Sequence, residues 1–184
     1  MNNKIIFILA DGFEEIEAFA PVDFLRRLGF EVVIVGTENI RIKGSHNIIV
    51  EADMLLSDLS GMPKAVILPG GMPGSTNLRD NKTVIELVRN VCEKGNLVAA
   101  ICAAPIALNA AGILGGKTIT SHPSVEDTFE ENVNYTGNRV ERDGNIITAK
   151  AAGVSFEFAA EIAEYYNKKE EAEALLKAMF VYKS

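Results

Sequence analysis

The feature that most limits the fold of this chain is the alternation of short apolar runs with longer amphipathic segments. Apolar runs rich in β-branched residues lie at 5–9, 32–35, 65–68 and 97–101, and amphipathic segments lie at 16–28 and 83–93. This order is typical of β-α-β units. The runs are apolar at successive positions rather than at alternate ones, so we expect both sheet faces to be covered. The sequence predicts an α/β fold, a doubly wound parallel sheet sandwiched by helices.

Two further segments predict antiparallel hairpins added at the edges of this sheet. The first spans 40–50, and the second spans 139–148 and contains Asp143-Gly144, a pair suited to a tight primed turn. Two helical patterns, at 156–167 and 170–179, complete the chain. Because no repeat, low-complexity segment or linker interrupts it, we expect residues 1–184 to form a single domain.

The composition excludes several classes of protein. A 48% hydrophobic and 23% charged chain is ordinary for a globular protein and argues against disorder. No apolar run approaches the roughly eighteen residues of a spanning helix, and the net charge of −7 without a basic patch argues against nucleic acid and membrane partners. Two cysteines and the absence of a signal peptide predict a cytoplasmic protein.

Chemically active residues follow four of the predicted strands. They are the acidic segment 11–17, the glycines Gly70 and Gly71, Cys102, and His122 after a strand at 117–120. Ligands of open α/β sheets bind beyond the carboxyl ends of the strands. We therefore expect a carboxylate, backbone amides, a thiol and an imidazole to share one rim.

The two cysteines are expected to differ. Cys102 lies where a buried strand turns into a helix that begins near Pro105, and the dipole and amides of that helix should lower the thiol pKa. A lone cysteine is also often a small buried hydrophobe, but this location favours a functional thiol. Cys92 shares an apolar helical face with Val84 and Val88 and is interpreted as a core residue.

Three acidic residues near the start of the first helix have structural explanations. Asp11 and Glu14 have the spacing of a capping box, and Glu15 gains from lying in the first helical turn. His46 lies in the predicted turn of the first hairpin and is expected at the surface. None of these residues requires a function.

Glu17 differs from its acidic neighbours. Helical spacing from it runs through the apolar residues Pro21, Phe24 and Leu28, so its carboxyl group is expected to point inward. A carboxyl group in that position must be paired or protonated. The alternative is a side chain that extends past the apolar stripe to water.

The glycines and the histidine each leave two interpretations open. The amides of Gly70 and Gly71 could bind an oxyanion, or the two glycines form only a tight turn. His122 could orient or deprotonate the thiol, or it is an ordinary loop residue before proline. The sequence has no dinucleotide-binding glycine pattern and no clustered metal ligands, so no cofactor and no metal are expected.

Several motifs in their order identify a resemblance that runs along nearly the whole chain. They are 10–17 ADGFEEIE, 68–71 LPGG, 99–105 AAICAAP and 120–123 TSHP. The chain resembles the ThiJ/PfpI superfamily, in its DJ-one-like branch. The resemblance implies a flavodoxin-like domain of the class I glutamine amidotransferase type, a homodimer, and Cys102 in a strained nucleophile elbow. It further implies that Glu17 is a protonated carboxyl group bonded to the sulfur, with the amides of Gly71 and Ala103 nearby.

The activities associated with this superfamily leave alternatives. Our first hypothesis is an enzyme in which Cys102 attacks glyoxal, methylglyoxal or their early adducts, Glu17 moves the proton, and the amides of Gly71 and Ala103 hold the oxyanion. The second is a redox-sensing stress protein or chaperone controlled by oxidation of Cys102; a stable scaffold with a vestigial site is the third. A peptidase or amidase is less favoured, because the protease-like branch has a histidine where this chain has Ala103.

Overall fold

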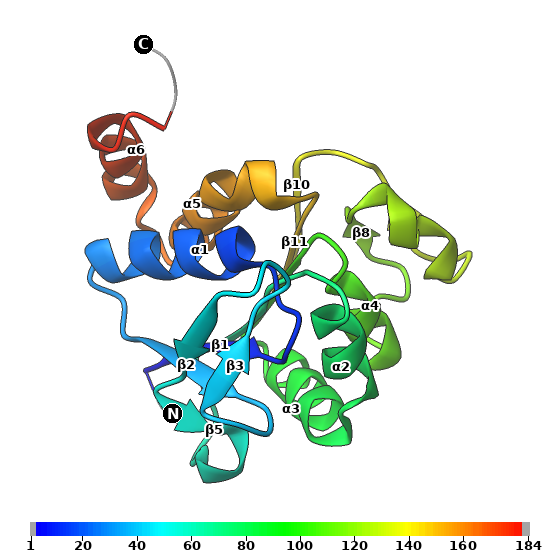
Figure 1. Ribbon diagram of the computed structural model, residues 1–184. Coiled ribbons are helices and arrows are strands. Elements are labelled where there is room, and N and C mark those ends of the chain that lie inside the picture. Colours follow the sequence, from blue (N-terminus) through cyan, green and yellow to red (C-terminus); the bar gives the residue numbers. More distant parts are fainter. Residues whose placement is uncertain (1–2, 182–184) are drawn as a thin grey trace.

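The computed structural model describes residues 3–181 and contains a seven-stranded sheet at its centre (Figure 1). Its strands, in spatial order, are β10 (Val140–Asp143), β11 (Ile146–Ala149), β7 (Leu97–Ile101), β6 (Ala65–Leu68), β1 (Ile5–Leu9), β2 (Val32–Gly36) and β5 (Met54–Leu55). All neighbours pair in parallel except β10, which pairs antiparallel with β11 at one edge. The predicted doubly wound α/β fold is confirmed.

Helices cover both faces of the sheet (Figure 1). One face is covered by α1 (Glu15–Arg27) and α5 (Ser155–Tyr165), against which α6 (Lys169–Ala178) packs; the other is covered by α2 (Gly74–Asp80), α3 (Lys82–Glu93) and α4 (Pro105–Ala110). Short 3-10 helices are η1 (Leu56–Asp58), η2 (Pro123–Thr128) and η3 (Ala152–Val154). None of the helices within residues 3–181 combines the length and apolar character needed to cross a membrane.

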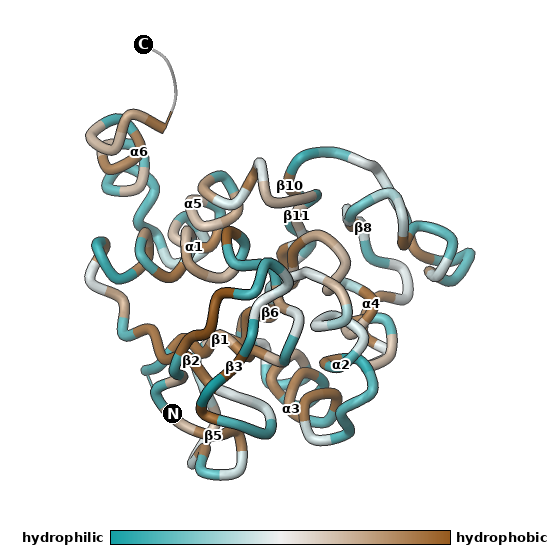
Figure 2. Tube along the Cα trace, viewed as in Figure 1, coloured by the Kyte–Doolittle hydropathy of each residue, from teal (hydrophilic) through white to brown (hydrophobic). Residues whose placement is uncertain are grey.

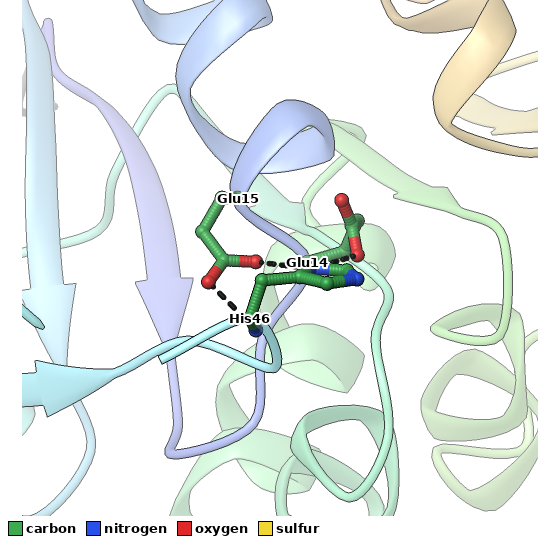
Figure 3. Close-up of side chains that lie close together, drawn as sticks. All are labelled: Glu14, Glu15 and His46. Carbon is green, nitrogen blue, oxygen red and sulfur yellow. Dashed lines mark hydrogen bonds and ion pairs between the residues drawn. The ribbon is translucent and has the colours of Figure 1, made fainter. Parts of the chain in front are cut away.

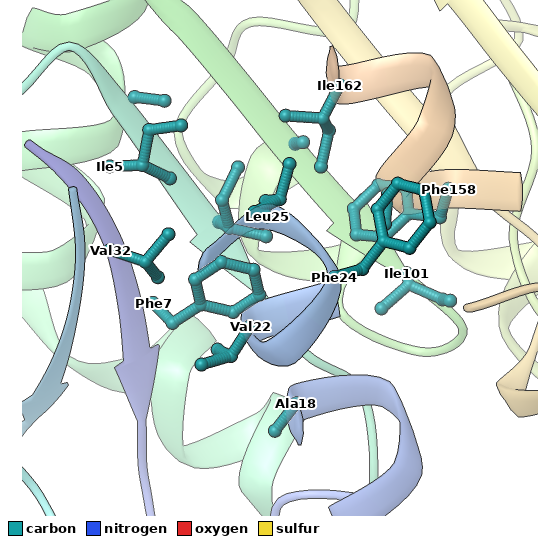
Figure 4. Packing of buried hydrophobic residues seen from close by; sticks show 14 of the residues in the cluster. Ile5, Phe7, Ala18, Val22, Phe24, Leu25, Val32, Ile101, Phe158 and Ile162 are labelled. Atoms are coloured by element: carbon teal, nitrogen blue, oxygen red, sulfur yellow. The ribbon is translucent and has the colours of Figure 1, made fainter. Parts of the chain in front are cut away.

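The apolar strands divide the core into two layers. In β1, Phe7 points toward α1 and α5, where it joins Phe24 and Phe158 (Figure 4), whereas Ile6 and Ile8 point to the opposite cluster. Successive side chains of a strand face opposite sides, so a strand with helices on both sides must be apolar at every position. The hydropathy of the trace accordingly peaks along the central strands (Figure 2).

The structure corrects the prediction of the first hairpin. Residues 40–50 do form an antiparallel hairpin, but β3 (Arg41–Lys43) and β4 (Ile49–Glu51) make a separate two-stranded sheet rather than an edge of the main sheet. Of its six strand residues only Ile42 is buried. The hairpin therefore lacks the apolar face that would have placed it in the core.

The assignment of the last strands also needs correction. The strand predicted at 117–120 is β8 (Thr118–Ile119), which pairs only with β9 (Asn134–Tyr135) in a separate sheet. The strand beside β7 at this edge of the main sheet is β11, which is parallel to β7 and buried at all four positions. The second hairpin is present as predicted, with β10 as the edge strand.

The strand order shows where a site is expected. From β1 the chain proceeds outward to β2 and β5, and then crosses back to β6, β7 and β11 on the other side. The direction therefore reverses between β1 and β6, which is where open α/β sheets bind their ligands. The loops after these two strands contain Glu14 and Gly70.

Candidate active site

Cys102 follows directly after β7 and has a strained backbone. Its φ angle of 63° lies in the left-handed region that residues other than glycine rarely adopt. Its amide donates to the carbonyl of Ala149 at 2.8 Å, and its own carbonyl accepts from the amide of His122 at 2.8 Å. The neighbouring segments therefore hold Cys102 in the strained elbow that the resemblance implies.

Glu17 lies in α1 with its carboxyl group directed at this elbow. Its side chain is buried, with 1% of the residue exposed, and its Oε2 accepts from the amide of Gly70 at 2.9 Å. The thiol of Cys102 and the amide of Ala152 also lie close enough to the carboxyl group to lower its pKa. The inward orientation predicted for Glu17 is confirmed, and water does not reach its carboxyl group.

Gly70 allows this close approach because it has no side chain. A Cβ atom at this position would meet the carboxylate of Glu17 and lie 2.6 Å from Cβ of Cys102. Gly71 has a φ angle of 90°, which favours glycine. The sequence 70–71 therefore lets the loop after β6 fit between α1 and the elbow.

The environment of the pair opposes negative charge. Burial raises the pKa of Glu17 to about 7, and the nearby charge of Glu14 adds to the rise. Burial, together with the charge of Glu17 and its hydrogen bond, raises the pKa of Cys102 to about 12. The predicted lowering of the thiol pKa is wrong in direction, because the amides of Ala103 and Gly71 do lower it but are outweighed. Two charges are disfavoured, so the pair shares a proton.

The three candidate amides have different partners. The amides of Gly71 and Ala103 both lie close enough to the sulfur of Cys102 to lower its pKa. The amide of Gly70 already donates a hydrogen bond to the carboxylate of Glu17. Of the three, only Gly71 and Ala103 are therefore placed to stabilise charge at the reacting atom.

The ring of His122 bonds to Ser124 rather than to the thiol. It is exposed, and its Nδ1 accepts from the amide of Ser124 at 3.2 Å and lies 2.8 Å from the Ser124 hydroxyl. Among residues 3–181 no hydrogen bond joins this ring to Cys102, and only the His122 amide contacts that residue. Cys92, in contrast, lies partly buried against the core, as predicted, and receives a hydrogen bond from Asn145 at 3.7 Å.

A second group of carboxylates lies at the start of α1, where Glu14 and Glu15 meet His46. This contact was not predicted from the sequence. The predicted capping box is absent: Glu14 is the N-cap without a side-chain cap, and Asp11 accepts from the amide of Lys43 at 2.8 Å. Glu15 is only 7% exposed and accepts from the His46 amide at 2.8 Å and the His46 ring at 3.0 Å (Figure 3). The first hairpin therefore uses Glu15 as an anchor.

This arrangement is better explained as an ion pair than as a metal site. The ligand atoms of Glu14, Glu15 and His46 lie within 4.8 Å of one another. However, the oxygens of Glu15 already accept from the hairpin, and Ser45 Oγ bonds to both carboxylates at 3.1 and 3.2 Å. We assign no metal to it.

Comparisons with known proteins show the family and support the fold. Residues 3–165 match the model of the DJ-1/PfpI family. The Drosophila melanogaster protein dj-1beta is 36% identical over 98% of both chains, and its crystal structure superposes with a TM-score of 0.91 at 35% identity, with full coverage of both chains. A glutathione-independent glyoxalase of Caenorhabditis elegans is 32% identical over 99% of this chain and 98% of its own. A deglycase of Pyrococcus horikoshii is 31% identical over 80% and 89%. The chain belongs to the DJ-1/PfpI family.

Proposed function

We propose that this protein is a cysteine-dependent enzyme that acts on small dicarbonyls such as methylglyoxal, or on their early adducts. The observation that carries the proposal is the contact of a buried carboxyl group, with a pKa near 7, with a thiol that also receives two backbone amides. A general acid or base works best when its pKa lies near the working pH. The relatives named as a glyoxalase and a deglycase support this reaction class.

The residues supply a balanced reaction sequence. The carboxylate of Glu17 takes the thiol proton as the sulfur of Cys102 adds to the aldehyde carbon, and it then gives that proton to the former carbonyl oxygen. The carboxylate of Glu17 then removes the hydrogen of that carbon as a proton and delivers it to the neighbouring carbonyl carbon, while the hydroxyl proton passes to the neighbouring oxygen. The first carbon is thereby oxidised to a thioester, and the second is reduced to an alcohol. Water hydrolyses the resulting thioester and releases a hydroxy acid and the thiol. This sequence requires a reduced thiol, for which we propose a cytoplasmic location.

The two amides and a nearby cleft suit small substrates. The amides of Gly71 and Ala103 stabilise the thiolate and then the oxygen that develops charge beside it. A cleft of about 310 Å³ lies alongside, lined by residues that include Met72, Ile106 and Val125. Met72 directly follows Gly71, and Ala103 packs with Ile106 and Val125. We propose this cleft, whose lining neighbours the two amides, as the approach of a small dicarbonyl to Cys102.

A homodimer forms part of the proposal. Ile16 of α1 and Ile48 and Ile49 of the first hairpin are exposed large apolar residues. They lie close together because the amide of Ile48 donates to Glu15 at 3.4 Å. A two-fold contact would cover this surface. Light scattering at tens of micromolar tests it, and the mass of a single chain would contradict it.

The decisive experiment measures lactate formed from methylglyoxal by protein prepared free of host glyoxalases. Wild type should form lactate, and Cys102→Ser should fall to background because its hydroxyl is a far weaker nucleophile. Cys92→Ser is the matched control and should retain full turnover. Lactate formation by Cys102→Ser, or none by wild type, would refute the proposed function.

A further inference from the structure

The turn of the first hairpin, residues 44–47, is fixed on the start of α1 by backbone hydrogen bonds. The amide of Ser45 donates to the carbonyl of Phe13 at 2.8 Å, and the amide of Gly12 donates to Lys43 at 2.7 Å. Gly44 approaches the carboxylate of Glu15 so closely that a Cβ atom would collide with it. The hairpin therefore holds its turn residues at a defined place beside the first turn of α1.

At this place one imidazole faces two carboxylates (Figure 3). Nδ1 of His46 lies 3.0 Å from Oε2 of Glu15 and 3.3 Å from Oε2 of Glu14. Both carboxylates are largely buried, whereas the His46 side chain is 71% exposed. The bond to Glu15 and the charges of Glu14 and Glu15 raise the pKa of His46. The ring therefore provides a positive charge that two poorly solvated anions need.

Glu14 connects this ion pair to the thiol site. Its amide donates to the carbonyl of Gly70 at 2.8 Å, and the amide of Gly70 donates to Glu17 at 2.9 Å. The negative charge of Glu14 also disfavours the ionised form of Glu17. Glu14 thus lies between His46 and the Glu17–Cys102 pair. The titratable groups along this path are Glu14, Glu15 and Glu17 on α1, His46 on the hairpin, and Cys102 after β7.

We propose that His46 is a positioning residue for the Glu17–Cys102 pair, which it affects by offsetting the charge of Glu14. A protonated ring makes the surroundings of the pair less negative and so increases the fraction of molecules in which the pair carries a negative charge. A neutral ring leaves Glu14 uncompensated and favours the fully protonated pair. The inference rests on the proposed role of this pair and adds a residue from a distant segment to it.

The test is the pH profile of Cys102 alkylation by iodoacetamide, followed by peptide mass spectrometry on the full chain at low ionic strength. His46→Gln should move the midpoint to higher pH and slow alkylation at pH 7 by about threefold, as expected for one charge acting across a partly solvated path. His46→Lys should restore the wild-type rate. At pH values where the wild-type ring is neutral, His46→Lys should exceed wild type.

A double-mutant cycle separates charge from local structure. Glu14→Gln alone should move the midpoint to lower pH, and adding it to His46→Gln should cancel most of the shift of the latter. Salt at about 0.5 M should shrink all these differences, because it screens exposed charges. Thermal melts of each variant monitor folding.

Two results would overturn the inference. The first is a set of identical midpoints in folded variants. The second is a His46→Gln shift that neither His46→Lys nor the Glu14→Gln addition reverses, which would assign His46 a purely structural role. Because alkylation does not require turnover, shifts without lactate formation refute only the proposed function, and lactate formation without shifts refutes only this inference.

Discussion

Glu15 and Glu17 are two residues apart on the same helix, and both are withdrawn from solvent, yet their acidities move in opposite directions. Burial favours the neutral form of each. For Glu15 the hydrogen bonds from the His46 ring, its own amide and the amides of His46 and Ile48 outweigh burial and lower its pKa to about 2. For Glu17 burial prevails, and its pKa rises to about 7.

The difference lies in the partners that each carboxyl group meets. Glu15 faces a hairpin turn that supplies amides and a cationic ring. Glu17 receives the amides of Gly70 and Ala152, but its third partner is a thiol that is itself an acid. Helix position and burial therefore do not decide the charge of a carboxyl group. The comparison assigns an anchoring role to Glu15 and leaves Glu17 free to exchange a proton.

The largest expected effect is on turnover. Glu17→Gln keeps the size of the side chain but cannot release a proton, so kcat for methylglyoxal should fall by roughly 100-fold or more. Alkylation of Cys102 by iodoacetamide should persist, which would show that the thiol is still accessible. Glu15→Gln is the matched control two residues away and should retain turnover within about fivefold, because only the ion pair with His46 changes.

Steady-state assays of both variants test this difference between Glu17 and Glu15, and two outcomes would contradict it. Unchanged turnover in Glu17→Gln, together with an unchanged alkylation profile, would remove Glu17 from the proposed site. A loss in Glu15→Gln as large as that in Glu17→Gln would mean that the anchored hairpin takes part in the chemistry.

The second prediction concerns stability. Here substitution of Glu15, rather than of Glu17, should have the larger effect. Glu15→Gln loses charge-assisted hydrogen bonds and should lower the free energy of unfolding by about 2 kcal/mol at pH 7. Because the folded pKa of Glu15 lies below its ordinary value of 4.5, its contribution is present above pH 4.5 and is lost as the pH falls toward 2. Urea unfolding across this range measures it.

Glu17 should show the opposite dependence. Its folded pKa is raised from 4.5 to about 7, so the folded state holds a proton that the unfolded state releases, and stability declines as the pH rises between these values. Glu17→Gln cannot ionise and should remove this decline. The free energy of unfolding of the variant, relative to that of wild type, should therefore be higher at pH 8 than at pH 5. Parallel pH profiles of the two variants would contradict the comparison.

Local periodicity predicted much of the fold and the orientation of Glu17. Apolar runs located the central strands, and the helical spacing of Glu17 with Pro21 and Phe24 identified an inward carboxyl group, because both depend only on nearby residues. The strand β11 was assigned to a hairpin alone, since its parallel partner β7 lies far away in the sequence. Pairing between distant segments leaves no local periodic signal.

The surroundings of the carboxyl groups were likewise not predictable from local sequence patterns. Glu15 and His46 are separated by 31 residues, and nothing in either segment indicates that they meet. The direction of the Cys102 pKa was wrong because the helix start was recognisable, whereas the extent of burial and the contact with Glu17 follow only from the assembled loops. The candidate groups were recognisable from the sequence, whereas the packing of distant segments determines their charge.

The smallest expected effect comes from removing one donor from Glu17. The amide of Ala152 lowers the pKa of the Glu17 carboxyl group, and Ala152 is the first residue of η3, a position where proline is well tolerated. Ala151 is extended, with φ −171° and ψ 175°, and so lies outside the helical region that a following proline disfavours. Ala152→Pro therefore deletes the N–H group with little other change. The loss of a donor to the charged form should raise the pKa of Glu17 by about 0.7 unit, the equivalent of a hydrogen bond of about 1 kcal/mol. NMR titration of the carboxyl carbons would report this shift. Ala152→Gly keeps the amide and is the control variant. Glu15 is the internal reference, whose pKa should not change. An unchanged Glu17 titration in Ala152→Pro, or an equal shift in Ala152→Gly, would show that this amide does not hold the charge of Glu17.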